Sequence, residues 1–101
     1  MIEIAKISGI GKYEEHSYGD KKQDRIFEVP GGKAFALMRQ KTLELRCDRR
    51  LRDVLKERYE TVMESRYFGK GGIEIIPTGQ IPDAEIEDLV RLSYNLTLQE
   101  S

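Results

Sequence analysis

The stretch from Lys33 to Tyr59 limits the choice of fold most, because two strand-like runs are followed directly by an amphipathic helix. In the first run, Lys33–Arg39, apolar residues occupy both even and odd positions, so both faces are expected to be buried and the strand to be central in a sheet. Pro30-Gly31-Gly32 is typical of a turn, which makes Ile26–Val29 its hairpin partner. We place Phe35 and Leu37 on one face and Ala36 and Met38 on the other.

The second run, Thr42–Cys47, alternates more cleanly between apolar and polar residues. We expect Leu43, Leu45 and Cys47 to share a buried face, and Glu44 and Arg46 to share a face exposed to solvent. Asp48 suits an N-cap position, since its carboxylate can accept hydrogen bonds from free amides of a first helical turn. A helix over Arg49–Tyr59 is therefore predicted, with apolar residues at helical spacing: Leu51, Val54, Leu55 and Tyr59.

The flanking segments complete the prediction. Met1–Ile10 favours a short helix ended by Gly9, whereas Lys12–Arg25 is polar, without periodicity, and is predicted to be a loop. Tyr67–Gly72 is expected to be a flexible loop before a strand over Ile73–Ile76. The loop and strand are expected to form part of a second hairpin, so that one or two strands follow the Arg49–Tyr59 helix. The last helix begins near Pro82, which suits a first turn, and its buried stripe is Ile86, Leu89, Val90, Ser93, Leu96 and Thr97.

These elements predict a single domain over residues 1–101, in the α+β class, with helices packed on one face of an antiparallel sheet. Hydrophobic residues make up 39% and charged residues 35% of the chain, which is compatible with a folded globular protein. The net charge of -1 is unevenly spread, because residues 33–72 hold 11 basic and 6 acidic side chains, and residues 73–101 hold 1 and 6. We expect a dipolar surface that meets a polyanion through one face only.

Cys47 is the single cysteine, so neither an internal disulfide nor a cysteine-rich metal site is expected. We expect a buried structural thiol, because Cys47 shares the apolar face of its strand. No apolar run approaches the roughly 20 residues that span a bilayer, and no leader sequence is recognised. These features predict a cytoplasmic protein, without a membrane partner or a cofactor, that acts as a monomer.

The chemical signal is a set of basic residues. Arg49, Arg52 and Lys56 are spaced to form a line along one edge of the predicted helix, and an anion would relieve their mutual repulsion. Arg39, Lys41 and Arg46 lie on the adjoining strands and link. A phosphate backbone is one expected partner, since neutralising each phosphate releases counterions. The alternative is a solvated surface in which these cations pair with Asp53, Glu57 and Glu60.

Two further segments carry side chains suited to binding. Gly69–Gly72 lacks the spacing of a P-loop, but Arg66, Tyr67, Phe68 and Lys70 beside and within it predict a basic, aromatic tip that could touch a base or groove. His16 shares a polar segment with Tyr18 and Asp20, and one imidazole with one carboxylate is too few ligands for a tight metal site. No catalytic motif is present, so we expect a non-enzymatic protein.

Several short blocks, in this order and spacing, resemble the MmcQ/YjbR family over nearly the whole chain. They are Ile7-Ser8-Gly9-Ile10, Glu14-Glu15, Ser17-Tyr18-Gly19, Gly32 to Leu37, Leu45 to Asp48, Ser65-Arg66-Tyr67, Ile81-Pro82-Asp83 and Ser93-Tyr94. The resemblance implies a CyaY/YjbR-like α-β-α sandwich. Many relatives carry a basic Asn-Lys-Lys/Arg-His-Trp motif where this chain has Gly69–Ile73, while a branch with a His-Tyr-x-Gly loop matches Arg66–Gly69 better.

Members of this family are commonly labelled DNA-binding, and the resemblance implies the same expectation here. We therefore expect a non-enzymatic module that contacts a nucleic-acid backbone through a basic strand and helix surface. The alternative is a protein-interaction or weak metal-binding module of the frataxin type, in which the acidic final helix or the exposed sheet face meets a partner. The expected contacts are Arg39, Lys41, Arg46, Arg49, Arg52, Lys56, Arg66 and Lys70, with Tyr67 and Phe68 as stacking residues.

Overall fold

The computed structural model describes residues 2–20 and 23–100. Within these ranges the chain forms an α+β fold, as predicted, with one antiparallel sheet and two α-helices. The predicted segments at Met1 and at residues 21–22 lie outside the described residues. The elements are η1 (Ile4–Lys6), β1 (Glu14–Ser17), β2 (Arg25–Glu28), β3 (Ala34–Met38), β4 (Leu43–Arg46), α1 (Arg49–Arg58), β5 (Val62–Ser65), β6 (Gly69–Ile75) and α2 (Asp83–Glu100).

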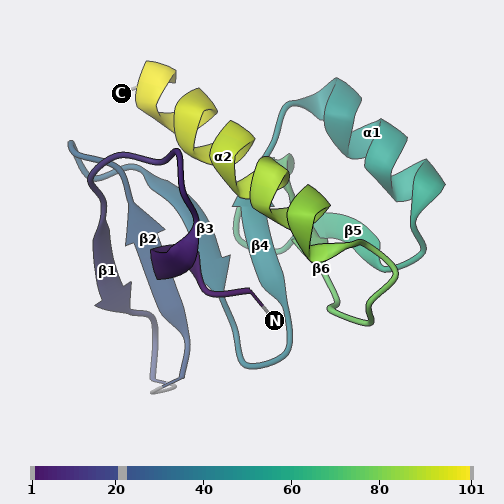
Figure 1. Ribbon diagram of the computed structural model, residues 1–101, viewed down its shortest axis with the longest axis horizontal. Helices are drawn as coiled ribbons and strands as arrows, with labels where there is room; N and C mark the ends of the chain where they lie inside the picture. The colour runs from purple at the N-terminus through teal and green to yellow at the C-terminus, as the bar shows by residue number, and fades with distance from the viewer. Residues whose placement is uncertain (1, 21–22, 101) are drawn as a thin grey trace.

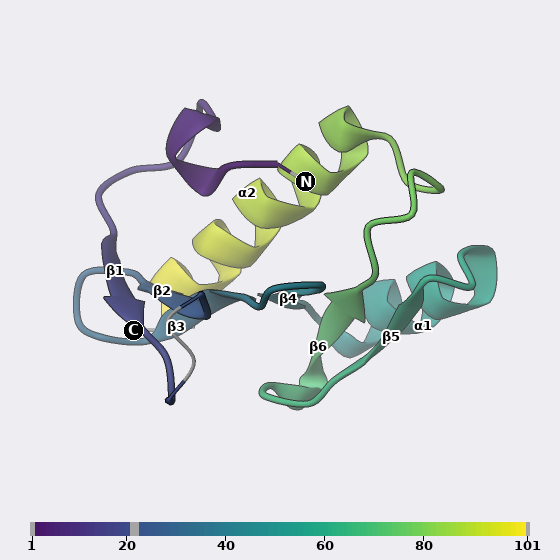
Figure 2. The ribbon, with the colours of Figure 1, turned by 90° about the horizontal axis from the view of Figure 1, so that it is seen from below.

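The six strands lie in the order β1-β2-β3-β4-β6-β5, and every neighbouring pair is antiparallel. Helix α2 crosses β3 and β4, and α1 packs against β5 and β6 (Figure 1). Seen from below, α2 and η1 lie on the same side of the sheet (Figure 2). Leu55 of α1 joins the same buried core as Val90 of α2, which confirms that the helices pack on one face, here called the helix face.

The central stretch folds as its pattern predicts. β3 is buried along most of its length, and α1 begins directly after β4. The Asp48 carboxylate caps α1 by accepting a hydrogen bond from the Leu51 amide, 2.9 Å away. On the helix face the core includes Phe35, Leu45 and Ile73, each fully buried. Only Cys47 and the capping residue Asp48 separate β4 from α1. The basic residues at the start of α1 therefore lie close to the end of β4.

A β-bulge makes the predicted face assignment of β3 wrong. Phe27 pairs with Ala36 but Glu28 pairs with Ala34, so Phe35 is skipped in the ladder. The extra residue places Phe35 in the helix-face core together with Ala36, while Leu37 packs with Ile26 on the opposite side. We call that opposite side the open face; besides Ile26 and Leu37, it carries Ala34, Glu44, Glu74, Tyr18 and Phe68.

Other local predictions needed correction. The N-terminal helix is reduced to the 3-10 turn Ile4–Lys6, and the predicted polar loop contains the edge strand Glu14–Ser17. Val62–Ser65 pairs with β6, which confirms the expected second hairpin and gives two strands after α1. Gly69–Gly72 is part of β6 rather than a loop, because its backbone pairs with β4 and β5. The turn between β5 and β6 instead consists of residues 66–68.

Helix α2 buries the predicted stripe, with Tyr94 added to it and Leu96 only half-buried. Acidic residues occupy its first turn, where the helix dipole favours negative charge. Among the helices of the described ranges, none combines the length and the apolar character that a membrane span requires.

Replacing Gly72 with alanine should destabilise the sheet by about 1–3 kcal/mol, because there is no space for a methyl group. A Cβ atom at Gly72 would lie 2.6 Å from both the Leu45 carbonyl oxygen and Phe68 Cβ. Gly71 is the matched control, since a Cβ there meets its nearest atom, the Phe68 carbonyl oxygen, at 3.5 Å. Urea unfolding of both variants checks this; equal midpoints for Gly71→Ala and Gly72→Ala would contradict it.

Candidate nucleic-acid interface

Two buried glutamates lie at the centre of the open face. Glu44 of β4 and Glu74 of β6 are cross-strand partners with 0% and 1% exposure. The prediction that Glu44 is solvent-exposed is therefore wrong. The alternation of apolar and polar residues predicts correctly which face of the sheet Glu44 lies on. The turn at residues 66–68, however, folds over this face and shields Glu44 from water.

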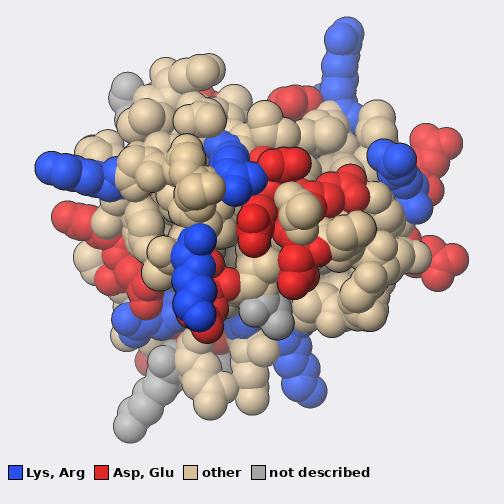
Figure 3. Space-filling model, viewed as in Figure 1, with Lys and Arg blue, Asp and Glu red and all other residues tan. Residues whose placement is uncertain are grey.

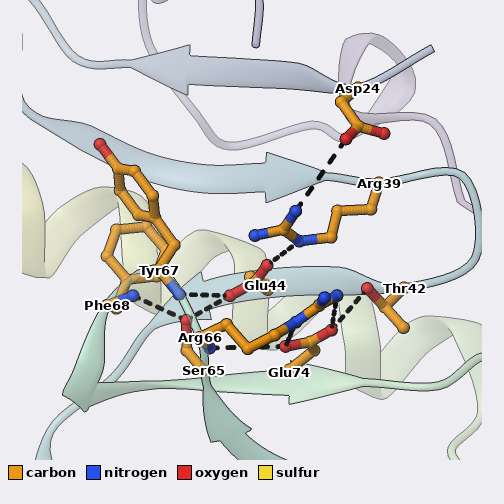
Figure 4. Close-up of polar contacts among 9 residues, drawn as sticks. All are labelled: Asp24, Arg39, Thr42, Glu44, Ser65, Arg66, Tyr67, Phe68 and Glu74. Carbon is orange, nitrogen blue, oxygen red and sulfur yellow. Dashed lines mark hydrogen bonds and ion pairs between the residues drawn. The ribbon is translucent and has the colours of Figure 1, made fainter. Parts of the chain in front are cut away.

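Each glutamate is satisfied by its own set of donors (Figure 4). Glu44 accepts hydrogen bonds from Arg39 Nε, from Ser65 Oγ at 2.6 Å and from the Tyr67 amide at 2.9 Å. Asp24 is also buried and pairs with Arg39 at 4.0 Å. The residues around Glu44 and those around Glu74 are together called the network here. The two carboxylates that face Arg39 leave it with little net charge for a ligand.

Glu74 is held by Arg66 and Thr42. The Arg66 Nη2 donor lies 2.7 Å and the Thr42 Oγ1 donor 2.8 Å from the carboxylate. Burial acts to raise the pKa of Glu74, but the hydrogen bonds and the charge of Arg66 outweigh it and lower this pKa below its usual value. In turn, hydrogen bonding to Glu74 raises the pKa of Arg66. Glu74 is therefore an ionised partner that neutralises Arg66.

The predicted line of cations on α1 is interrupted at Arg52. Its side chain is 10% exposed and points to the hairpin of β5 and β6. It donates to the Lys70 carbonyl oxygen at 2.9 Å and contacts Asp53 and Glu64 at 2.9 and 3.4 Å. Arg49 and Lys56 remain exposed on α1, and Lys41 is exposed in the turn between β3 and β4. Arg52 thus fastens α1 to the sheet.

Aromatic rings cover the network. Tyr67 lies edge-on to Tyr18 and to Phe68, with ring centroids 5.5 and 4.9 Å apart. Arg39 lies over the Tyr18 ring, and the Arg46 guanidinium carbon lies 5.0 Å from the centre of the Phe68 ring. Tyr67 itself is 41% exposed. Aromatic rings interleaved with guanidinium groups are the composition that stacks on nucleic-acid bases.

A hollow of about 330 Å³ lies at the end of β4, between the start of α1, the first residues of β6 and the last turns of α2. It brings together three of the predicted contacts, Arg46, Arg49 and Lys70. Arg46 is anchored by a hydrogen bond from Nε to the Ala34 carbonyl oxygen, at 3.1 Å. The remaining lining residues are Cys47, Asp48, Gly71, Leu96 and Glu100. The three cations exceed the two carboxylates, so the hollow suits a single phosphate group.

Cys47 lines the same hollow but is only 6% exposed, which confirms the prediction of a buried thiol. Burial, with a smaller contribution from the charge of Asp48, raises its pKa to about 11 against the lowering effect of Arg52. The thiol is therefore protonated at neutral pH and is not an activated nucleophile.

Sequence reasoning missed Tyr18, Ser65 and the two glutamates of the network. One signal was present, because Glu44 and Glu74 are each flanked by β-branched or leucine residues within a strand. Two such glutamates paired across neighbouring strands require cations or hydrogen-bond donors as partners. The pairing itself, however, depends on a register that the sequence does not specify.

Comparison with known proteins gives a family and a fold. A family model described as YjbR matches residues 10–96. A search of curated proteins found no match. A Deinococcus radiodurans protein of the DUF419 domain is similar in structure, with a TM-score of 0.76 and 17% identity over 89% of this chain and 71% of that one. A Pseudomonas syringae protein has a TM-score of 0.72 and 17% identity over 84% and 86%.

Proposed function

This chain belongs to the YjbR family, and we propose that it is a non-enzymatic module that binds single-stranded nucleic acid, DNA in the first place, across the open face of its sheet and the hollow at the end of β4. The observation that carries the proposal is the 41%-exposed Tyr67 ring, which contacts Phe68, the ring over which the Arg46 guanidinium lies. Arg46 also lines a hollow together with Arg49 and Lys70. A base stacks on Tyr67, and a phosphate of the same strand enters the hollow. Phe68 connects the stacking residue with the hollow, because its ring contacts the Tyr67 ring and lies against the Arg46 guanidinium.

The charge distribution supports the open face rather than the helix face. Carboxylates gather over the first half of α2, as the helix-face view shows (Figure 3). The nearest cation on that helix, Arg91, is paired with Asp88 at 2.7 Å and Glu87 at 3.6 Å. An approaching polyanion is repelled from this side and is thereby directed to the other.

The same geometry favours a single strand over a duplex. Duplex binding rests on many phosphate contacts at once, whereas Arg39, Arg52 and Arg66 are neutralised by carboxylates of the protein. Stacking on an aromatic side chain needs an unpaired base, and it contributes about 1–3 kcal/mol per base. The exposed Tyr67 ring can stack on a base of a single strand directly, whereas the bases of a duplex would first have to be unpaired and unstacked.

Fluorescence anisotropy with labelled single-stranded and duplex oligonucleotides across a salt series tests the proposal. We expect tighter binding of the single strand, with affinity falling as salt rises. Tyr67→Ala should weaken binding roughly 5- to 100-fold through lost stacking. Lys70→Ala should reduce the salt slope by about 0.7, whereas Lys56→Ala, an exposed cation outside the hollow, should not.

Absence of binding to either oligonucleotide at low salt would overturn the proposal and would favour the alternative of a protein-interaction or weak metal-binding module. A tighter complex with duplex DNA would contradict the role given to Tyr67. The proposal retains a monomeric, cytoplasmic protein without a cofactor, supported by a free, buried cysteine that suits a reducing compartment.

A further inference from the structure

Pairing of β1 with β2 brings together three side chains that are scattered in the sequence. Glu14 is the cross-strand partner of Glu28, and His16 follows two residues along the same strand. Residues two apart in a strand point to the same side, so all three share one face, at the edge of the sheet. From the sequence, His16 was expected to have Asp20 as its one nearby carboxylate, too few ligands for a tight site. The pairing of β1 with β2 brings Glu14 and Glu28 to His16 instead.

We propose that Glu14, His16 and Glu28 form a binding site for a divalent first-row transition metal ion of the zinc class. His16 Nε2 lies 3.3 Å from Glu14 Oε2 and 3.3 Å from Glu28 Oε1. One ligand atom from each of the three side chains falls within 4.8 Å of the others. Tetrahedral ligands lie about 3.4 Å apart when their bonds to zinc are about 2.0–2.1 Å long, so the spacing fits with little rearrangement.

Electrostatics also favours a cation at this position. Like charges directly opposite each other on neighbouring strands destabilise a sheet, and Glu14 and Glu28 are such a pair. A divalent ion between them removes this repulsion, while His16 Nε2 supplies the third ligand atom. Imidazole with carboxylates suits zinc, cobalt or iron better than magnesium or calcium, which prefer oxygen ligands alone.

Exposure of the three side chains determines what kind of site this is. Glu28 is 25% exposed, against 50% for His16 and 73% for Glu14. Glu28 therefore holds the ion against the sheet, and solvent reaches the ion from the side of Glu14 and His16. Three protein ligands leave the remaining coordination positions to water, as in open rather than closed zinc sites.

Calorimetric titration of zinc chloride into the untagged, chelator-treated protein tests the proposal. We expect saturable binding of one ion, retained in excess magnesium chloride. His16→Ala and Glu28→Gln should each reduce the affinity at least about tenfold. Glu15→Gln is the matched control, because Glu15 is the neighbour of both Glu14 and His16 and its carboxylate pairs instead with Arg25, 2.8 Å away. The Glu15→Gln variant should bind zinc with the same affinity as the unmodified protein.

Cobalt provides a second measurement that does not depend on variants. Addition of Co²⁺ to the unmodified, ¹⁵N-labelled protein should broaden the amide signals of residues 14–16 and 26–28 first. Absence of saturable zinc binding would overturn the proposal, as would broadening centred elsewhere or undiminished affinity in both ligand variants. The three ligands are not among the residues proposed to contact nucleic acid, so failure of nucleic-acid binding leaves this test unaffected.

Discussion

Replacing Glu44 with alanine should destabilise the protein by about 3–5 kcal/mol, as much as the truncation of a large core residue. Glu44 is fully buried and accepts hydrogen bonds from Arg39, Ser65 and the Tyr67 amide. Removing the carboxylate leaves a guanidinium group in the network without its closest partner and frees the turn that carries Tyr67. Urea unfolding followed by far-UV circular dichroism measures the change.

Two further variants separate charge from volume. Glu44→Gln keeps the size of the side chain but removes its charge, and we expect most of the destabilisation to remain. Glu15→Ala removes an exposed ion pair with Arg25, in which both side chains are 39% exposed, and should cost no more than about 1 kcal/mol. A Glu44→Gln protein as stable as the original would show that the network contributes no net stability.

Replacing Ser93 with alanine should cost about 3 kcal/mol, because one hydroxyl joins α2 to two strands. Ser93 Oγ donates to the Phe35 carbonyl oxygen at 2.6 Å and accepts from the Arg46 amide at 2.9 Å. Phe35 is the extra residue of the β-bulge between β2 and β3, and its carbonyl group accepts this hydrogen bond from Ser93 of α2. Each buried backbone group left unsatisfied costs about 1–3 kcal/mol.

Asn95→Ala is the control for Ser93→Ala. It lies on the same helix but is exposed, and alanine improves helix propensity at both positions. We expect the Asn95 variant to stay within about 0.5 kcal/mol of the original protein in thermal and urea unfolding. If the two variants lose equal stability, the hydroxyl of Ser93 does not hold the helix to the sheet.

The elements that could be predicted from sequence are those with a clear apolar period. β3, β4, α1 and α2 were found within a few residues, because buried apolar side chains and the Asp48 cap mark them. β1 was missed since all of its residues are exposed, and an edge strand of that kind has no apolar pattern to detect. The start of β6 was missed because glycines have low strand propensity and are held there by pairing.

The candidate site was predicted in part, and the errors have one physical origin. Charged residues were assumed to be solvated, but Arg52 is buried against the Lys70 carbonyl oxygen, and Glu44 and Glu74 are enclosed by the turn between β5 and β6. Such burial depends on which strands are neighbours. Arg46, Arg49 and Lys70 were predicted from charge alone, and the structure gathers them in one hollow beside Phe68.

The most direct test of nucleic-acid binding on the open face is a nuclear magnetic resonance titration of the ¹⁵N-labelled protein with a short single-stranded oligonucleotide at low salt. We predict that the largest amide shifts occur at Tyr67, Phe68, Lys70 and Gly71, and that they grow in proportion to the bound fraction. Shifts confined to α1 and α2, or a spectrum unchanged at saturating oligonucleotide, would contradict the account.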